Sequence, residues 1–394
     1  MIEKNICFIY MDSAEKSFMD LLAVEAEKRG YRTLVTDNPF QKCDIGVYCQ
    51  HINFPQYSKF SVIMLHDIIQ QYGNWPDLWY REPWNKYDVG ILPSVQWVNN
   101  WNKCSQWYYA RPKKGMFRVG WPKADVISGV DLVQYRKEFN EMHDLDSTKK
   151  TILYAPAWEN DNKQDDFVKA MLGLDVNIII KQWDADPKKF PEVVENIKRM
   201  YELHKNIERV KILPPSMNIF KAIMASDILV SEESSTMSEA ALVGVPAVSV
   251  SDWLIPDVKP SRYPDCHYDF VTLTKKAELR NCIAEMVSNY DKYKTEVEQY
   301  RNLNFSNIGS SCSMIMDIID DCLNGKNVRY EMLKPKKNER VPLKKDIKRL
   351  YGQLYREMYA NWKVNNVLFG ALWKFLKMIK DMLLKKGRKD YGIN

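Results

Sequence analysis

The sequence predicts an α/β protein with two Rossmann-like, doubly wound domains that face each other across a cleft, followed by a basic helical tail. Two successive series of short β-rich runs alternate with amphipathic segments of helix length, which is typical of parallel strands joined by helical crossovers. At 394 residues the chain is also long enough to bury two cores. We therefore expect an N-terminal domain over residues 1–145, a second domain over 146–330 and the tail over 331–394.

The first series starts close to the N-terminus and has a helix-length segment, residues 18–30, behind its first strand. Its strand-like runs are apolar and bounded by polar or turn-forming residues. A polar stretch over residues 138–150 separates this series from the next, which places the domain boundary there. The predicted strands of the first series are 6–10, 32–36, 45–48, 61–65 and 89–93.

The second series repeats the alternation, with amphipathic segments at 165–174, 190–205, 217–226 and 236–244. In open α/β sheets, ligands bind beyond the carboxyl ends of the strands. Functional residues are therefore expected in the loops that follow the strands. The predicted strands of this series are 151–156, 176–180, 210–213, 227–231 and 246–250.

Charge is distributed unevenly along the chain. Residues 334–394 carry 17 lysines and arginines against 5 acidic residues, a net charge of +12, and the rest of the chain carries −6. Within the tail, residues 367–389 place apolar side chains on one helical stripe surrounded by lysines. Such a helix can lie in an anionic membrane interface, although a helix packed on the body with solvated lysines is the alternative. The stripe is Leu372, Phe375, Leu376, Ile379 and Leu383, and the lysines are Lys374, Lys377, Lys380 and Lys385.

Cysteine spacing and hydropathy indicate a cytoplasmic protein. The eight cysteines include no CxxC pair and no Cys/His cluster, so neither a disulfide framework nor a zinc site is indicated. The first apolar run is too short for a signal peptide, and no window reaches the roughly 18 uninterrupted apolar residues of a spanning helix. We expect a protein held peripherally at the inner face of the cell membrane by its tail.

One polar segment, SEESSTMSEAALVGVPAVSV over residues 231–250, joins an apolar strand to an apolar helix. Ser234, Ser235 and Thr236 place hydroxyl groups at the start of that helix, where backbone N–H groups and the helix dipole favour an anion such as a diphosphate. Glu239, one turn into the helix, can accept hydrogen bonds from ribose or substrate hydroxyls. The alternative is ordinary N-capping by Ser235, with Glu239 in a capping-box arrangement.

Three segments resemble signatures of a known family. They are TILYAPAWEN (151–160), the segment 217–250 that contains the hydroxyl groups, and, more weakly, VGWPKADVI (119–127). Together they resemble the CDP-glycerol glycerophosphotransferases of wall teichoic acid and capsule polysaccharide synthesis. The resemblance implies the GT-B fold of glycosyltransferases, a nucleotide-activated donor on the second domain, and catalysis without a bound metal or other cofactor.

The chain departs from that family's pattern in two places. The family carries a His-Gly pair after a strand of the first domain, taken to supply the catalytic base, whereas this chain has His66 followed by Asp67. The family's Lys-x-His-Pro run corresponds here to Lys181 followed by Gln182 and Trp183. The resemblance therefore leaves the identity of the donor open.

His66 and Asp67 are the candidate catalytic residues, because they follow a buried run and should emerge at the cleft. An imidazole can take the proton of an acceptor hydroxyl, with Asp67 orienting the ring or replacing it as the base, and a structural histidine is the alternative. Lys181 can neutralise the donor phosphates, unless it is a solvated lysine at a strand end. Tyr154 and Pro156 follow the first strand of the second domain and can frame the base, unless the tyrosine serves in packing between domains.

An aromatic-rich segment, residues 72–88, supplies the candidate acceptor site. Trp75, Trp79 and Arg81 combine ring faces that stack on sugars or cover a lipid-linked acceptor with a charge that orients it. Packing under a long loop is the alternative. Single-stranded nucleic acid also stacks on such rings, but the acidic body lacks the basic groove that a phosphate backbone needs. Neither a nucleic-acid partner nor a metal is expected.

The sequence thus predicts a membrane-associated transferase that moves a polyol phosphate from a CDP-activated donor to a lipid-linked or oligosaccharide acceptor, releasing CMP. One alternative is a GT-B glycosyltransferase that uses a nucleotide sugar for surface polysaccharide synthesis, which the altered run after Lys181 favours. Another alternative is a catalytically inactive, membrane-peripheral scaffold of the same fold, which the missing His-Gly pair would allow.

Overall fold

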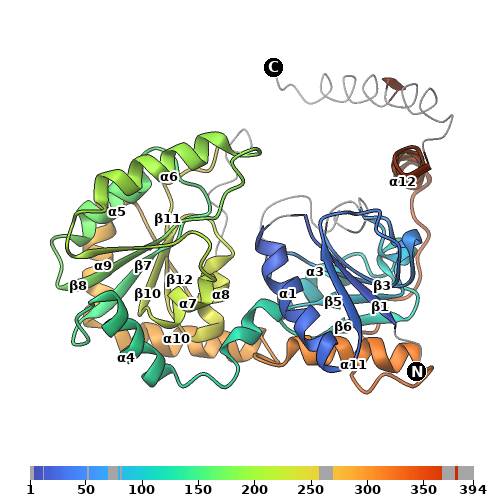
Figure 1. The fold of residues 1–394 in the computed structure, drawn as a ribbon, viewed down its shortest axis with the longest axis horizontal. Coiled ribbons are helices and arrows are strands. Elements are labelled where there is room, and N and C mark those ends of the chain that lie inside the picture. Colours follow the sequence, from blue (N-terminus) through green and yellow to red (C-terminus); the bar gives the residue numbers. More distant parts are fainter. Residues whose placement is uncertain are drawn as a thin grey trace.

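The computed structural model describes residues 4–11, 13–50, 53–69, 79, 82–256, 269–365 and 378–379. Two six-stranded sheets form the centres of two lobes that lie side by side (Figure 1). Neighbouring strands in both sheets run parallel, and helices cover them. The structure confirms the predicted α/β class with two doubly wound sheets.

The N-terminal lobe is built on a sheet with strand order β2-β1-β3-β4-β5-β6. All four residues of β5 and the last five of β4 are buried, as expected for parallel strands covered on both faces. With η marking a 3₁₀ helix, the elements are β1 (Asn5–Ile9), α1 (Ser13–Lys28), β2 (Arg32–Thr36), β3 (Cys43–Cys49), η1 (Pro55–Tyr57), β4 (Ser58–Met64), η2 (Trp84–Lys86), β5 (Val89–Leu92), α3 (Val95–Asn102), η3 (Tyr108–Ala110), β6 (Gly115–Arg118) and η4 (Pro122–Ile127).

The second lobe has strand order β12-β11-β10-β7-β8-β9. Along the chain, strands are added first on one side of β7 (β8, β9) and then on the other (β10, β11, β12), so the topology switches between β7 and β10. Its central strands are mostly apolar, and Ile178, Ile179 and Ile180 of β8 are fully buried between helical layers. The elements are β7 (Lys150–Tyr154), α5 (Lys163–Met171), β8 (Val176–Lys181), α6 (Pro191–His204), β9 (Val210–Leu213), α7 (Ile219–Met224), β10 (Ile228–Ser231), α8 (Thr236–Val243), β11 (Ala247–Val250), β12 (Val271–Thr274), η5 (Lys276–Glu278) and α9 (Leu279–Ser288).

Two helices pack on the lobe opposite to the one that the predicted boundaries give them. α4 (Leu132–His143) falls in the predicted N-terminal domain, but its Arg136 donates a hydrogen bond to the carbonyl of Met224 (2.9 Å) in the second lobe. α11 (Ser311–Leu323) falls in the predicted second domain, but it packs against α1 of the first (Figure 1). The chain crosses to the second lobe between η4 and α4 and returns between α10 (Tyr290–Asn304) and α11.

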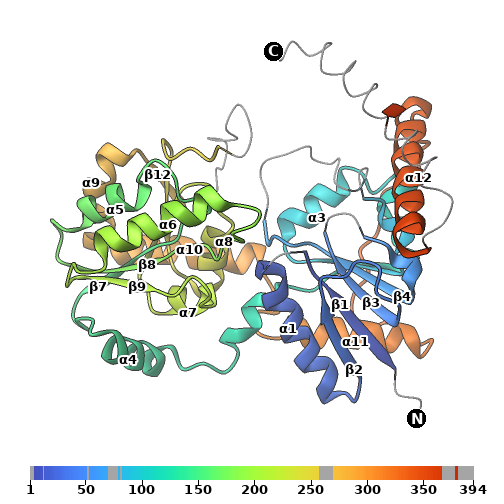
Figure 2. The same ribbon diagram turned by 45° about the horizontal axis from the view of Figure 1, so that its top comes forward.

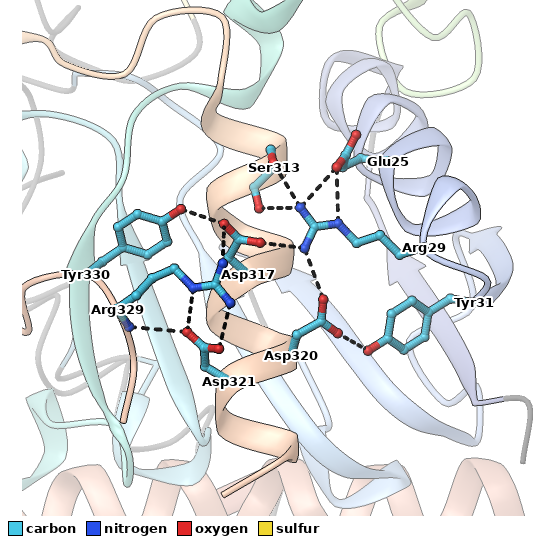
Figure 3. A network of polar contacts seen from close by, with 9 residues as sticks. All are labelled: Glu25, Arg29, Tyr31, Ser313, Asp317, Asp320, Asp321, Arg329 and Tyr330. Atoms are coloured by element: carbon cyan, nitrogen blue, oxygen red, sulfur yellow. Dashed lines mark hydrogen bonds and ion pairs between the residues drawn. The ribbon is translucent and has the colours of Figure 1, made fainter. Parts of the chain in front are cut away.

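Arg29, directly after α1, ties α11 to the N-terminal lobe (Figure 3). Its guanidinium donates to Asp317 (2.7 Å) and Asp320 (3.0 Å), both on α11. A second arginine, Arg329, donates to Asp321 (2.9 Å) on the same helix. These charge-assisted hydrogen bonds hold the returning helix in place in addition to its apolar contacts.

Replacing Arg29 with methionine is expected to lower the free energy of unfolding by about 1–3 kcal/mol. The substitution leaves Glu25, Asp317 and Asp320 close together without their shared cation, at a place where the Arg29 side chain is 21% exposed. Lys28→Met, at the neighbouring position that ends α1, is the control, because Lys28 is 67% exposed and lies 3.4 Å from Glu25. Equal stability of the two variants in urea unfolding would show that the network contributes nothing.

α12 (Leu343–Asn365) packs against the N-terminal lobe (Figure 2). The guanidinium of Arg349 is buried there and lies 4.9 Å from the ring centroid of Tyr108. None of the described helices combines the length and apolar content that spanning a membrane requires. The predicted amphipathic helix over 367–389 lies outside the described residues, apart from residues 378–379.

Candidate functional site

A cavity of about 260 Å³ lies between the lobes, at the carboxyl ends of β7 to β10. Tyr154 of β7 pairs with Val230 of β10 and Ile180 of β8, so the loops after these strands leave the sheet at one edge. The strand order reverses here, which is where open α/β sheets bind ligands. The lining is Ala14, Ser17 and Lys123 from the first lobe and Ala155, Pro156, Ala157, Lys181, Gln182, Trp183, Asp184, Pro215, Ser216, Met217, Asn218, Ile219, Ser234, Ser235, Thr236 and Glu239 from the second.

Ser234, Ser235 and Thr236 meet this cavity at the start of α8. The Thr236 hydroxyl donates to Ser234 Oγ (2.8 Å), and the Thr236 backbone N–H donates to the same oxygen (3.2 Å). Ser235 is the N-cap residue, but its side chain makes no capping hydrogen bond within the described structure. Its hydroxyl is therefore not used in the way that the N-capping alternative requires.

Lys181 enters the cavity from the end of β8. Its ammonium group donates to the carbonyl oxygens of Pro215 (2.8 Å) and Gln182 (3.2 Å). Burial, and next the positive charge of Lys123, lower the pKa of Lys181 to about 8. Lys181 thus brings a positive charge to a partly enclosed cavity in which Lys123 is paired with Glu239, and this charge favours an anion.

Lys123 is a cavity residue that sequence reasoning did not identify. It lies in η4 of the first lobe, and its Nζ is 2.8 Å from Oε1 of Glu239 in the second lobe. Trp121 Nε1 donates to the same oxygen (3.1 Å). Both residues belong to the weak signature over 119–127, which was the signal that could have found them. Oε2 of Glu239 is buried and accepts no hydrogen bond from the described part of the chain.

A buried ion pair fixes the loop after β7, which carries Pro156 to the cavity. The carboxylate of Glu232 accepts hydrogen bonds from the backbone N–H groups of Ala157 (3.2 Å) and Trp158 (2.9 Å). Lys163 lies 3.3 Å from Glu232 and donates to the carbonyl of Trp158 (2.9 Å). The side chains of the pair are 1% and 0% exposed, so the shape of this loop depends on two charges with little access to water.

The prediction that Tyr154 frames the ligand is wrong. Its side chain is fully buried, its ring stacks on Phe167 (5.0 Å between centroids), and its hydroxyl donates to Glu159 (2.8 Å). Because β7 lies in the middle of a sheet with helices on both faces, the last side chain of the strand is turned into the core. Burial raises the pKa of the Glu159 carboxyl to about 7.

His66 and Asp67 follow β4 of the first lobe, but neither is among the described residues that line the cavity. His66 Nε2 lies 2.9 Å from Asp67 Oδ2, and the backbone carbonyl of Asp67 accepts a hydrogen bond from Trp97 Nε1 (3.0 Å). The two side chains are arranged so that the carboxylate can orient the imidazole. Their part in catalysis stays a prediction.

The aromatic acceptor site is not formed by Trp79, and that prediction is wrong for this residue. Trp79 is fully buried and packs edge to face against Trp84 (5.7 Å) and Trp97 (6.0 Å) in the core of the first lobe. Since six-membered and indole rings bury more apolar area than any other side chain, the packing alternative holds here. Trp75 and Arg81 lie outside the described residues.

A different indole reaches the cavity. Trp183 lines it and packs against Phe190 (4.8 Å between centroids) and Trp158 (6.0 Å). It stands where the family pattern has histidine, and this departure was the signal that could have marked it. An aromatic face at that point can stack on a sugar ring or a base.

Two parallel sheets that face a shared cavity, with the strand order of the second reversing beside it, define a GT-B-like α/β protein. A sequence profile of the CDP-Glycerol:Poly(glycerophosphate) glycerophosphotransferase family matches residues 80–308, more than half of the chain. The chain belongs to this family and is a transferase. A search of curated protein sequences finds no significant match.

Solved structures share the fold at low sequence identity. The wall teichoic acid polymerase TagF superposes with a TM-score of 0.58 at 14% identity, over 82% of this chain and 90% of TagF. A putative UDP-N-acetylglucosamine 2-epimerase from Listeria monocytogenes gives 0.56 at 12% identity, over 85% of this chain and 100% of the epimerase. The MnaA protein of S. aureus, solved with UDP, gives 0.53 at 13% identity, over 86% and 100% of the two chains.

Within the described ranges, no three His, Cys, Asp or Glu side chains come together in a way that could hold a metal ion.

Proposed function

We propose that the cavity binds the diphosphate of CDP-glycerol and that the enzyme transfers glycerol phosphate to a hydroxyl group of a lipid-linked or oligosaccharide acceptor in cell-surface polymer synthesis. This proposal rests on one observation: a single cavity is lined by Ser234, Ser235, Thr236, Lys181 and Lys123. Hydroxyl groups, backbone N–H groups at a helix start and two ammonium groups complement a diphosphate. Membership of the family supports the CDP-glycerol donor.

In this transfer, the acceptor oxygen attacks the phosphorus atom that carries the glycerol. The bond from that phosphorus to the oxygen shared with CMP breaks, and negative charge develops on the departing phosphate. Lys181, Lys123 and the start of α8 are placed to stabilise that charge. The proton of the acceptor hydroxyl passes to His66, whose ring is oriented by Asp67.

Glu239 has a separate role in this proposal. Its Oε1 is held by Lys123 and Trp121, while its buried Oε2 has no hydrogen-bond donor in the described structure. A buried carboxylate oxygen gains from a hydrogen bond, because leaving it without one is costly. We assign Oε2 the hydroxyl group of a ribose or glycerol.

Thermal-shift screening against CDP-glycerol, CDP-ribitol, UDP-sugars and CMP-sugars tests the donor. Stabilisation by CDP-glycerol, together with acceptor-dependent CMP release, is the expected result. Stabilisation by UDP-sugars instead would favour the second candidate, a glycosyltransferase, which the aromatic face of Trp183 at the cavity supports. A protein that binds CDP-glycerol but never turns it over with any acceptor fraction would be a scaffold.

The affinity for the donor should depend on pH through Lys181. An anion binds the charged form, and the pKa of Lys181 is about 8 in the unliganded protein. Binding is therefore expected to be constant below pH 8 and to weaken above it, by up to about tenfold per pH unit. Isothermal titration with CDP-glycerol from about pH 6.5 to about pH 9.5 measures this, and Lys181→Arg should remove the break near pH 8. A flat wild-type profile would contradict the role of Lys181.

We also propose that the tail binds an anionic membrane surface. α12 presents an apolar row to solvent on the face turned away from Tyr108 and the lobe. The net charge of +12 over residues 334–394 would add attraction to anionic lipids that weakens with salt. The apolar row is Leu343, Ile347, Leu350 and Leu354, which are 49% to 68% exposed.

Replacing Ile347 and Leu350 together with glutamate is expected to weaken binding to phosphatidylglycerol-containing vesicles by about tenfold or more, because two apolar side chains no longer enter the interface. The control replaces Val133 and Met142 of α4 with glutamate, since they are 81% and 77% exposed on the other lobe and the charge change is the same. Vesicle cosedimentation measures both. Equal binding by the two double variants would contradict the proposal.

A further inference from the structure

Gln182 lines the cavity immediately after Lys181, and its side chain is almost wholly enclosed. Its Nε2 donates to Glu159 Oε2 (2.7 Å) and to Gln164 Oε1 (2.7 Å). Both hydrogens of the amide nitrogen are thereby used. The amide oxygen, Oε1, is buried and receives no hydrogen bond from the residues that the structure describes.

Neighbouring hydrogen bonds fix which way this amide is turned. Glu159 also accepts from the Tyr154 hydroxyl (2.8 Å) and the Gln164 backbone N–H (3.3 Å), so its carboxylate acts as an acceptor on every side. Gln164 uses its own amide nitrogen on the carbonyl of Met200 (3.1 Å), which leaves its oxygen to face Gln182. Turning the Gln182 amide over would set its oxygen against these two acceptor oxygens.

A buried acceptor without a donor is costly in the unliganded protein and is satisfied when a ligand brings an N–H or O–H group. Asp184 and Trp183 follow it along the same cavity wall, so the residue stands among other groups that face a ligand. Gln182 thus combines a place in the cavity lining with a buried acceptor that no described residue satisfies, and the ligand that suits it carries a donor at that point.

We propose that Gln182 Oε1 accepts a hydrogen bond from the bound donor substrate and that Glu159 and Gln164 are positioning residues that hold its amide. This inference rests on the proposed function. The group recognised is an N–H or O–H donor, which in CDP-glycerol is the amino group of cytosine or a hydroxyl group. Uracil presents a carbonyl oxygen where cytosine has its amino group, so the same acceptor would disfavour a uridine nucleotide.

Isothermal titration of the full chain with CDP-glycerol, CDP, UDP and inorganic pyrophosphate tests this proposal. It is best done between the pKa of Glu159, about 7, and that of Lys181, about 8. Gln182→Met keeps the volume and removes the acceptor, and the same substitution at the exposed Gln134 of α4, Gln134→Met, is the control. Glu159→Gln is the second variant, because it provides a donor that can turn the Gln182 amide over.

Gln182→Met is expected to lose about 10- to 100-fold in affinity for CDP-glycerol while its affinity for pyrophosphate stays within about twofold of the wild type. An equal loss with CDP but not with UDP assigns the acceptor to the cytosine base, an equal loss with both nucleotides assigns it to the ribose, and a loss confined to CDP-glycerol assigns it to the glycerol hydroxyls. In the first case Glu159→Gln should reduce the preference for CDP over UDP, which a purely structural role would leave unchanged.

Unchanged binding of CDP-glycerol by Gln182→Met would overturn the inference and leave the proposed function standing. A loss of equal size with pyrophosphate would overturn it too, because the substitution would then have disturbed the whole cavity. If the wild-type protein binds neither cytidine nor uridine nucleotides, the proposed function fails first and this inference fails with it.

Discussion

Lys163→Met is expected to lower the free energy of unfolding by about 3–5 kcal/mol, because it leaves a carboxylate buried without its counter-ion. Glu232 is fully buried, and Lys163 lies 3.3 Å from it at 1% side-chain exposure. The lysine also donates to the carbonyl of Trp158 (2.9 Å), which would lose its partner. The effect should therefore reach the loop that carries Pro156 to the cavity as well as the stability of the second lobe.

Lys169→Met is the matched control, since Lys169 lies on the same helix, is 71% exposed and pairs with Asp165 at the surface. Urea unfolding followed by circular dichroism measures both variants, and the control should behave as the wild type. Combining Lys163→Met with Glu232→Leu should recover part of the loss, because the unpaired charge is then gone. A Lys163→Met protein as stable as the Lys169→Met control would refute the idea that this pair organises the loop.

The sheet strands were largely predictable because a buried parallel strand is an apolar run between polar turns. β8 illustrates this, since VNIII over 176–180 corresponds to buried residues at each position. The edge strands β6 and β12 were not predicted. They are four residues long, and GMFR and VTLT each contain polar or glycine positions that do not stand out from a loop.

The cavity was only partly predictable, for a reason that lies in the topology. Ser234 to Thr236 are neighbours in sequence at a helix start, so a local pattern reveals them. Lys123 reaches the same cavity from the other lobe, where its Nζ lies 2.8 Å from Glu239 of α8, and the orientation of the Gln182 side chain is fixed by Glu159 and Gln164. Contacts of this kind depend on how the lobes and helices pack, and hydrophobic periodicity and motif spacing in the sequence do not reveal that packing.

Trp79 shows the opposite error. The cluster of aromatic residues predicts a ligand surface, with packing as the alternative, but Trp79 is enclosed by Trp84 and Trp97 in the first lobe's core. Composition alone cannot separate these cases, because a large ring stabilises a core and a binding site by the same burial of apolar area. The departure from the family pattern at Trp183 was the more informative signal, since it lies directly after a strand.

Lys181→Met is expected to weaken CDP-glycerol binding by about 100- to 1000-fold, because it removes a cation that faces the diphosphate in a partly dehydrated cavity. The unliganded protein should keep its thermal midpoint. Burial lowers the pKa of Lys181 to about 8, so the charged side chain opposes folding at neutral pH, and its removal offsets the lost hydrogen bonds to Pro215 and Gln182.

The affinity for CDP-glycerol reports on ligand recognition, and the thermal midpoint of the unliganded protein reports on folding. Lys221→Met is the control, since Lys221 is exposed on α7, whose first residue, Ile219, lines the same cavity. Lys181→Arg should restore most of the affinity if charge alone matters, and less if the compact ammonium group between Pro215 and Gln182 is needed. Full affinity in Lys181→Met would place the diphosphate elsewhere. A fall in both the affinity and the thermal midpoint would instead show that Lys181 has a structural role. In that case its hydrogen bonds to the carbonyls of Pro215 and Gln182 would determine the shape of the cavity.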